Sequence, residues 1–299
     1  GKVDDAALAA RLMDHNQVLC IVSTKRQACT VFHMLSGEGN YHLSKWMTSA
    51  HIKRTIDEIR ERLRHGEICR VVATNLVEAG VDLSFPAVYR ASAGLDSLIQ
   101  AGGRCNREGK YLLEDSIVYI FDPESKYTAR MPASIQRQAA IMETVTLHAP
   151  DIADLAVVNR YFNNLYNNLE STAPGTTDGL DLRHIISDFE DCQKGSFPFA
   201  DVAEKFKLID DNTVSIFIPQ DEDSRRLAGK LESEESHISA ADYRLIGKYC
   251  VNVYADTAKK ISHSITMINE HFAILAAAEM YDPKTGLKAE DEGGFGIMM

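Results

Sequence analysis

The chain has 299 residues, of which 45% are hydrophobic, so it can bury a substantial core and is long enough for two domains. No stretch approaches the roughly 18 consecutive apolar residues of a membrane span, and the first residues lack the apolar core of a signal peptide. We therefore expect a cytoplasmic protein with no membrane partner. Because the chain begins with Gly1 rather than Met, we also expect a fragment of a longer protein.

The formal net charge of -11 is unevenly distributed along the chain. Residues 1–130 contain 17 Lys and Arg against 16 Asp and Glu, whereas the remainder contains 15 against 27. Because phosphate contacts need cationic surface, a nucleic-acid groove is expected mainly on the first 130 residues. The six cysteines are scattered, so no disulfides are predicted. No metal site is predicted either, since no ligand spacing is evident at His148, His184, His237, His263 and His271.

The first 130 residues alternate short apolar runs with longer amphipathic segments, which is typical of parallel β/α units. Thr24 and Gln27 have the spacing of a capping box, which predicts a helix ending near Gly37. Thr48 leads into a charged helix ending at His65. The expected strands are Val18–Val22, Tyr41–Leu43, Cys69–Ala73, Ala87–Arg90 and Ile117–Phe121. Such a sheet places its ligand sites beyond the carboxyl ends of the strands.

The rest of the chain predicts a helical region at 131–195 and a small α+β domain at 196–299. Residues 133–169 are expected to be helical on either side of Pro150, and Ser171–Gly179 is linker-like. The expected elements that follow are a helix in 197–206, a strand at 214–218, a helix at 238–246, a strand at 249–254 and a terminal hairpin. The acidic runs at 221–223 and 232–235 are interpreted as solvated surface.

The segment from Val72 to Asp82 follows a predicted strand and could carry chemistry. Thr74 and Asn75 provide a hydroxyl and an amide at a helix start, where free backbone N–H groups can hold a phosphate. Asp82 could accept hydrogen bonds from a ribose or hold a basic residue in place. In the alternative interpretation, Asn75 and Glu78 only cap a helix and Asp82 is a turn residue.

The second such segment is Leu98–Arg107. On a helix, Gln100, Arg104 and Arg107 project from one face, and Gly103 removes bulk between them. Two guanidinium groups directed at one place can stabilise the charge that develops in phosphoryl transfer. Glycine inside a helix costs about 1 kcal/mol relative to Ala, which favours close approach of a ligand or another backbone. The alternative is two surface arginines paired with carboxylates such as Glu108.

The pattern Thr74-x-x-x-Glu78-x-Gly80-Val81-Asp82 resembles motif V of superfamily 2 helicases, and Gln100-x-x-Gly103-Arg104-x-x-Arg107 resembles motif VI. Residues 20–28 resemble motif IV, and 42–47 resemble the segment that follows it. The Glu-Ala-Gly-Val-Asp form, together with 199–211 and 281–287, is similar to the CRISPR-associated helicase-nuclease of type I systems, subtype I-C. The resemblance covers nearly the whole chain and implies a second RecA-like lobe at 1–130 followed by an accessory C-terminal domain.

The resemblance implies the functional residues as well. Arg104 and Arg107 would face the γ-phosphate of ATP with support from Gln100, and Gly80, Asp82 and Gly103 would lie near the nucleotide. The residues implied for DNA are Ser23, Thr24, Lys25, Ser44, Thr74, Asn75 and Glu78. The implied cofactors are ATP and Mg²⁺, and the implied partners are single-stranded DNA, an RNA-guided surveillance complex and possible phage inhibitor proteins. Asn75 and Ala101 depart from the Gln and Arg that are frequent in the family, and these departures leave Arg104 and Arg107 intact.

Several parts of a complete motor are absent from the sequence. It contains no Gly-x-x-x-x-Gly-Lys-Ser/Thr loop to hold a triphosphate, no Asp-Glu-x-His box, and no His-Asp pair of a nuclease centre. The chain is therefore expected to depend on a first lobe and a nuclease domain that it lacks, and to be inactive alone. The alternatives are another superfamily 2 helicase such as a repair translocase, or a non-catalytic interaction module. A Rossmann-like enzyme is disfavoured, because no Gly-x-Gly-x-x-Gly follows the first strand.

Overall fold

The computed structural model describes residues 2–78, 80–129, 131, 133–146, 151–171, 189, 197–205, 212–233 and 237–289. The chain forms two compact units, one made of Gly1–Pro132 with Asn212–Phe295 and the other of Ala133–Asp211 with Gly296–Met299. The acidic C-terminal region therefore packs in one unit with the first sheet. Beyond Ser171, the expected linker lies outside the described residues. Within the described ranges, no helix has the length and apolarity needed to cross a bilayer.

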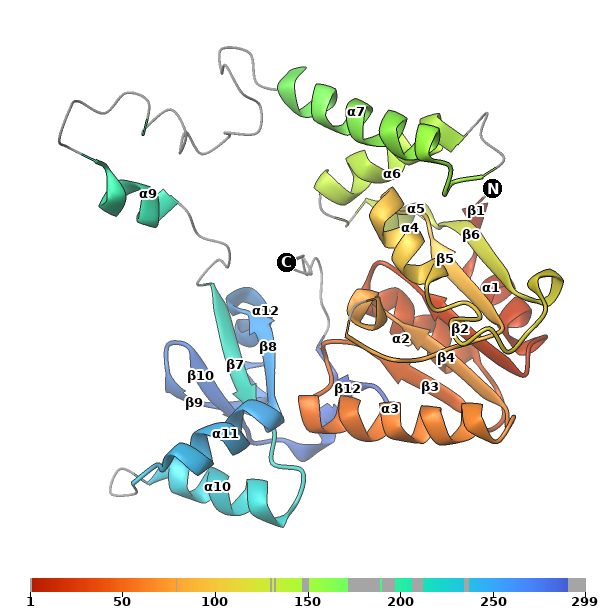
Figure 1. The fold of residues 1–299 in the computed structure, drawn as a ribbon. Helices are drawn as coiled ribbons and strands as arrows, with labels where there is room; N and C mark the ends of the chain where they lie inside the picture. Colours follow the sequence, from red (N-terminus) through yellow and green to blue (C-terminus); the bar gives the residue numbers. More distant parts are fainter. Residues whose placement is uncertain are drawn as a thin grey trace. The chain divides into compact units, whose positions relative to one another are not determined.

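The first unit contains a parallel sheet of six strands in the order β1-β6-β5-β2-β4-β3 (Figure 1). Its strands are β1 (Lys2–Val3), β2 (Gln17–Ile21), β3 (Asn40–Leu43), β4 (Cys69–Ala73), β5 (Ala87–Ala91) and β6 (Ile117–Pro123). Every residue of β2, β4 and β5 is buried, as expected of strands covered on both faces. The five predicted strands are confirmed, whereas β1 was not foreseen.

Helices cover both faces of this sheet. They are α1 (Asp5–Met13), α2 (Lys25–Met34), α3 (Ser49–Arg64), α4 (Leu95–Gly102) and α5 (Ser125–Thr128), with 3₁₀ turns at Asn75–Val77 and Leu113–Asp115. One core joins α1 and α2 to the sheet, and a second joins α3 and the end of α4 to its other face. The capping box is only half formed. Thr24 Oγ1 accepts the N–H of Gln27, but the Gln27 side chain donates to Asp5 instead.

The C-terminal part of the unit has a four-stranded sheet in the order β8-β7-β10-β9. Its strands are β7 (Thr213–Phe217), β8 (Cys250–Tyr254), β9 (Ile265–Asn269) and β10 (Phe272–Leu275), and a hairpin follows from β11 (Tyr281–Asp282) to β12 (Gly286–Leu287). The helices are α10 (Glu222–Glu232), α11 (Ala240–Tyr249) and α12 (Ala255–Lys260). Helix α10 was missed because its acidic start was interpreted as plain surface. Asp221 caps this helix by accepting the N–H of Ser224 at 2.9 Å.

The second unit contains α6 (Ala133–Thr146), α7 (Leu155–Ser171) and α9 (Phe199–Lys205). The first two helices confirm the expected break near Pro150, which itself lies outside the described residues. Tyr161 of α7 is fully buried among their side chains. None of the predicted site residues lies in this unit.

Candidate functional site

The segment from Thr74 to Asp82 forms the first part of the connection from β4 to β5. Thr74 directly follows β4, where its backbone N–H donates to Leu43 O over 3.0 Å and its side chain is buried. The predicted helix start is only the three-residue 3₁₀ turn after Thr74, and the Thr74 hydroxyl makes no cap. Asn75 is half-buried. Gly80 has a φ of +74°, a conformation that favours glycine, and the turn it forms leads to the exposed Asp82.

The predicted single helical face of motif VI is wrong. Helix α4 ends at Gly102 with Gly103 as its cap, so Arg104 and Arg107 lie in the turn beyond the helix and only Gln100 is on it. Two adjacent glycines favour such an end over a further helical turn. Gln100 and Gly103 are both exposed.

The predicted location at the carboxyl ends of the strands is also wrong for motif VI. Phe85 N–H donates to Arg104 O over 2.9 Å, and Asn106 N–H donates to Phe85 O over 2.8 Å. Because Phe85 precedes β5, these bonds place the turn near the amino end of that strand. The reason is the β/α connection itself, since α4 runs back along β5 from the strand's carboxyl end.

Arg104 joins motif VI to motif V. Its side chain is 6% exposed, its Nε donates to Val77 O over 3.0 Å, and its Nη2 donates to Glu78 O over 2.6 Å. Its Nη1 is buried with no hydrogen-bond partner among the described residues. Burial, and then the charge of Arg107, lower the pKa of this guanidinium. Arg104 therefore fastens the two segments together and keeps one unused donor.

Arg107 remains accessible. Its Nε lies 3.0 Å from Asp82 Oδ1, and the two side chains are 47% and 74% exposed. Asp82 can thus hold the guanidinium in place while much of it faces outward. A Cβ at Gly102 would meet nothing within 4 Å, and one at Gly103 would meet only carbonyl oxygens of its own helix. The end of α4 therefore leaves room for close approach by another molecule.

Glu78 does not face outward, contrary to its predicted place at the DNA. It is buried, and its Oε1 lies 2.8 Å from Arg90 Nε in β5. Burial raises the pKa of Glu78 and lowers that of Arg90, and the charge of each partner opposes these shifts. Arg90 Nη1 donates to Ala91 O over 3.0 Å and to Ser23 Oγ over 3.4 Å. Arg90 was not predicted as a functional residue, although an arginine in an otherwise apolar buried strand indicates a buried acidic partner.

Ser44 is also not available to DNA in this structure. It is fully buried, with its Oγ 2.9 Å from His42 Nε2 and 3.2 Å from the backbone N of Trp46, to which it is an acceptor. The β11–β12 hairpin packs on the residues that follow, and Leu287 N–H donates to Trp46 O over 2.8 Å. Ser23, Thr24 and Lys25 are half-buried after the end of β2, and Lys25 Nζ lies 5.3 Å from the Trp46 ring centre.

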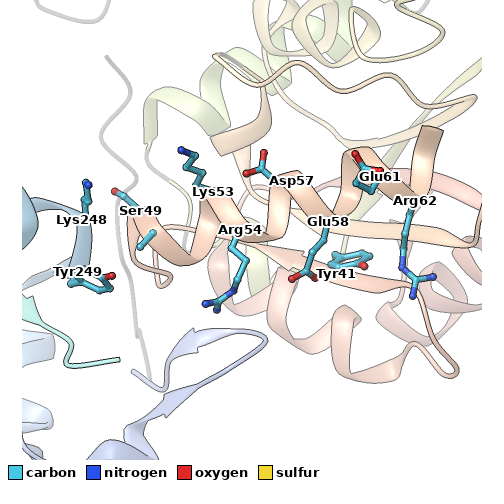
Figure 2. Close-up of a pocket in the computed structure, with 11 residues that line it drawn as sticks. Tyr41, Ser49, Lys53, Arg54, Asp57, Glu58, Glu61, Arg62, Lys248 and Tyr249 are labelled. Atoms are coloured by element: carbon cyan, nitrogen blue, oxygen red, sulfur yellow. The ribbon is translucent and has the colours of Figure 1, made fainter. Parts of the chain in front are cut away.

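A groove that the sequence did not predict lies between α3 and the end of α11 (Figure 2). Its volume is about 950 Å³. Figure 2 shows Lys53 and Arg54 on the first turns of α3, with Lys248 at the same end of the groove. None of these three exposed cations forms an ion pair with a described residue, whereas Asp57 and Glu61 further along are paired with Arg60 and Arg64. One end of the groove is therefore cationic.

The described residues offer no metal site, since no three His, Cys, Asp or Glu side chains among them could hold an ion together. The cationic groups described above instead favour an anionic ligand. Arg107 and the cationic groove could each contact a phosphate.

Part of the chain is similar to a known protein family. Residues 14–110 match the family model described as "CRISPR-associated nuclease/helicase Cas3, C-terminal". The chain is 54% identical over 56 residues to the CRISPR-associated nuclease/helicase Cas3 of Haloferax volcanii, which covers 18% of this chain and 6% of that protein.

Solved structures show the same fold over most of the chain. T. fusca Cas3 matches with a TM-score of 0.63 and 14% identity, covering 96% of this chain and 42% of its own. A chain of a "CRISPR RNA-guided surveillance complex, pre-nicking" matches with a TM-score of 0.53 and 15% identity, covering 91% of this chain and 40% of its own. The chain thus spans less than half of these solved relatives. Together, the family match, the relative and the shared fold support its similarity to a C-terminal part of the Cas3 nuclease/helicases.

Proposed function

We propose that the chain is the C-terminal half of an ATP-dependent, single-strand DNA translocase and helicase-nuclease of the Cas3 kind, which unwinds and degrades foreign DNA. In this proposal the chain contributes motifs IV to VI, while a first RecA-like lobe holds most of ATP and Mg²⁺. The observation that carries the proposal is the Asp82–Arg107 pair, in which a carboxylate of motif V orients an exposed guanidinium of motif VI.

Arg107 is the residue we propose to face the γ-phosphate across the interface with the first lobe. A guanidinium in this position stabilises charge on the transferring phosphoryl group, an effect of about 10³ to 10⁵ in rate for arginine fingers. Arg104 is buried and does not reach as far, so its proposed role is to hold motif V against motif VI through the Val77 and Glu78 carbonyls. The open surface at Gly102 and Gly103 fits the close approach of a partner lobe.

Single-stranded DNA is proposed to lie at the carboxyl ends of the strands, whereas the motif VI turn lies near the amino end of β5. Ser23, Thr24 and Thr74 follow the carboxyl ends of β2 and β4, and the groove beside α3 adds Lys53, Arg54 and Lys248. These cations supply the attraction to phosphate that the acidic C-terminal region lacks. That region is proposed to cover the DNA channel and to offer contacts to an RNA-guided surveillance complex. The structural neighbour in such a complex supports this partner.

The test is Arg107→Ala in the full-length protein that contains this chain. We expect its ATPase rate to fall by about 10³-fold or more, with single-strand DNA binding retained. The matched control is Arg226→Ala, because Arg226 is also exposed and paired with a nearby acid, Asp223, but lies on α10. ATP turnover that survives Arg107→Ala would show that the motif VI assignment is wrong. If the wild-type protein has no DNA-dependent ATPase, an interaction module becomes the better interpretation.

A further inference from the structure

We propose that Arg90 is a positioning residue that couples DNA contacts to ATP hydrolysis by holding motif IV and motif V in one arrangement. The inference rests on the proposed function and deepens it. Arg90 belongs to none of the helicase motifs, since it lies within β5. It acts through its neighbours and touches neither ligand.

A continuous series of polar contacts passes through Arg90. Its Nη1 donates to Ser23 Oγ of motif IV over 3.4 Å, and its Nε lies 2.8 Å from Glu78 Oε1 of motif V. The backbone carbonyl of Glu78 in turn accepts a hydrogen bond from Arg104 Nη2 of motif VI over 2.6 Å. Motifs IV, V and VI are therefore linked by one series of contacts, in which Arg90, Glu78 and Arg104 are buried and Ser23 is half-buried.

Stability alone does not account for a buried ion pair at this position. Arg90 is 3% exposed and Glu78 is 8% exposed, and neither contacting atom has another hydrogen-bond partner among the described residues. Removing two charges from water is expensive, and well-packed apolar replacements of such pairs are often neutral or stabilising. An apolar residue would fit the β5 pattern, since Tyr89 and Ala91 beside it are buried hydrophobics. The charged pair therefore fits a role in holding the segments at a defined spacing.

The guanidinium shape suits this role. Arg90 contacts the Glu78 carboxylate through Nε, and the Ala91 carbonyl and the Ser23 hydroxyl through Nη1. The planar guanidinium has five N–H donors in a fixed arrangement, whereas a lysine ammonium is a compact charge on a flexible stem. With Arg90 in place, a displacement of Ser23 on DNA binding is transmitted to Glu78 and on to Arg104.

The test compares coupling with folding in the full-length protein. The main variant is the double change Arg90→Met with Glu78→Gln, which removes both charges and leaves no unpaired buried ion. We expect it to fold with a near-normal thermal midpoint but to lose about fivefold or more of the single-strand DNA stimulation of ATPase. Because coupling is reciprocal, a non-hydrolysable ATP analogue should also stop changing the affinity of this variant for single-stranded DNA.

Arg90→Lys is the second variant. It keeps a positive charge beside Glu78 but lacks the second guanidinium nitrogen that donates to Ser23. We expect it to fold and to show the same reduced coupling, and it decides the question if the double variant is unstable. Wild-type DNA stimulation and wild-type reciprocity in a folded variant would overturn the inference. Failure of the proposed function looks different, because the wild-type protein itself would then show no DNA-stimulated ATPase.

Discussion

The hydroxyl oxygen of Tyr281 accepts a hydrogen bond from the backbone N–H of Thr48 over 3.0 Å. Thr48 is the N-cap of α3, and Tyr281 begins the β11–β12 hairpin, so this bond joins the C-terminal region to the start of α3. His51 Nδ1 lies 2.9 Å from the same hydroxyl, and Gln220 Nε2 donates to Thr48 Oγ1 over 3.0 Å. The hairpin is thus held by a polar cluster beside the cationic groove.

The stability of this contact is expected to depend on pH through His51. Burial first, and the charge of Arg54 second, lower the pKa of His51 from 6.5 to about 4. Because the unfolded chain then binds the proton more readily, this stability is present above pH 6.5 and is lost as the pH falls towards 4. The loss at pH 5 is on the order of 2 kcal/mol.

Denaturant unfolding at pH 5 and pH 7.5 checks this expectation. His51→Asn should reduce the difference between the two pH values, whereas His33→Asn, at an exposed position, should leave it as in the wild type. An equal difference in all three proteins would contradict the role of His51. Part of the dependence should remain in His51→Asn, because burial also lowers the pKa of His42 to about 4.

Gly286→Ala is expected to weaken hairpin docking. Gly286 has a φ of +87°, and an added Cβ would lie 2.2 Å from Trp46 O, so the hairpin would have to move. Gly66→Ala is the matched control, since Gly66 has a φ of +70° and nothing within 4 Å of an added Cβ. Both variants introduce backbone strain at a positive φ, but only Gly286→Ala adds a steric clash. We expect this clash to lower the free energy of unfolding by about 1–3 kcal/mol more than in Gly66→Ala. Equal thermal midpoints for the two variants would argue against the close contact.

The groove cations are expected to contact DNA phosphates. Lys53→Ala and Lys248→Ala should each weaken single-strand DNA binding and reduce the slope of log K against log salt concentration by about 1. Lys259→Ala is the control, because Lys259 is exposed but pairs with Asp256 away from the groove. Fluorescence anisotropy over a range of salt concentrations gives both quantities. An unchanged slope in both groove variants would exclude phosphate contact there.

The isolated chain is expected not to hydrolyse ATP, because its sequence lacks a phosphate-binding loop of the Gly-x-x-x-x-Gly-Lys-Ser/Thr type. Phosphate release from purified chain, with and without single-stranded DNA, measures this directly. Arg107→Ala in the same chain identifies contaminating activity, since a contaminant is unaffected by the change. Turnover that disappears in the variant would show that the chain contains a complete site.

The sheet could be predicted from the sequence because the pattern of apolar runs is a local signal. Cys69–Ala73 was predicted with the bounds that β4 has, and Thr24 and Thr48 were found as helix starts. Strand β1 has only two residues and pairs with β6 at the far end of the first 130 residues, so no local pattern reports it.

The site was predicted less completely, because burial and direction depend on tertiary contacts. Ser44 and Glu78 are polar residues in the expected segments, yet both are buried. The β11–β12 hairpin packs on the residues that follow Ser44, and Arg90 forms an ion pair with Glu78. The predicted geometry of motif VI was wrong because helical spacing was assumed beyond Gly102, where α4 ends. The Asp82–Arg107 contact was foreseen only as the possibility that Asp82 holds a basic residue.

Arg104 binds motif V through two main-chain carbonyls rather than through side chains. Every residue type supplies a carbonyl, so substitution at Val77 leaves the acceptor in place as long as the backbone keeps its course. Among relatives, Val77 can therefore vary in identity without loss of the link to motif VI, whereas replacement of Arg104 removes both bonds at once. Evolutionary constraint on the side chains of this connection is therefore expected at Arg104 and not at Val77.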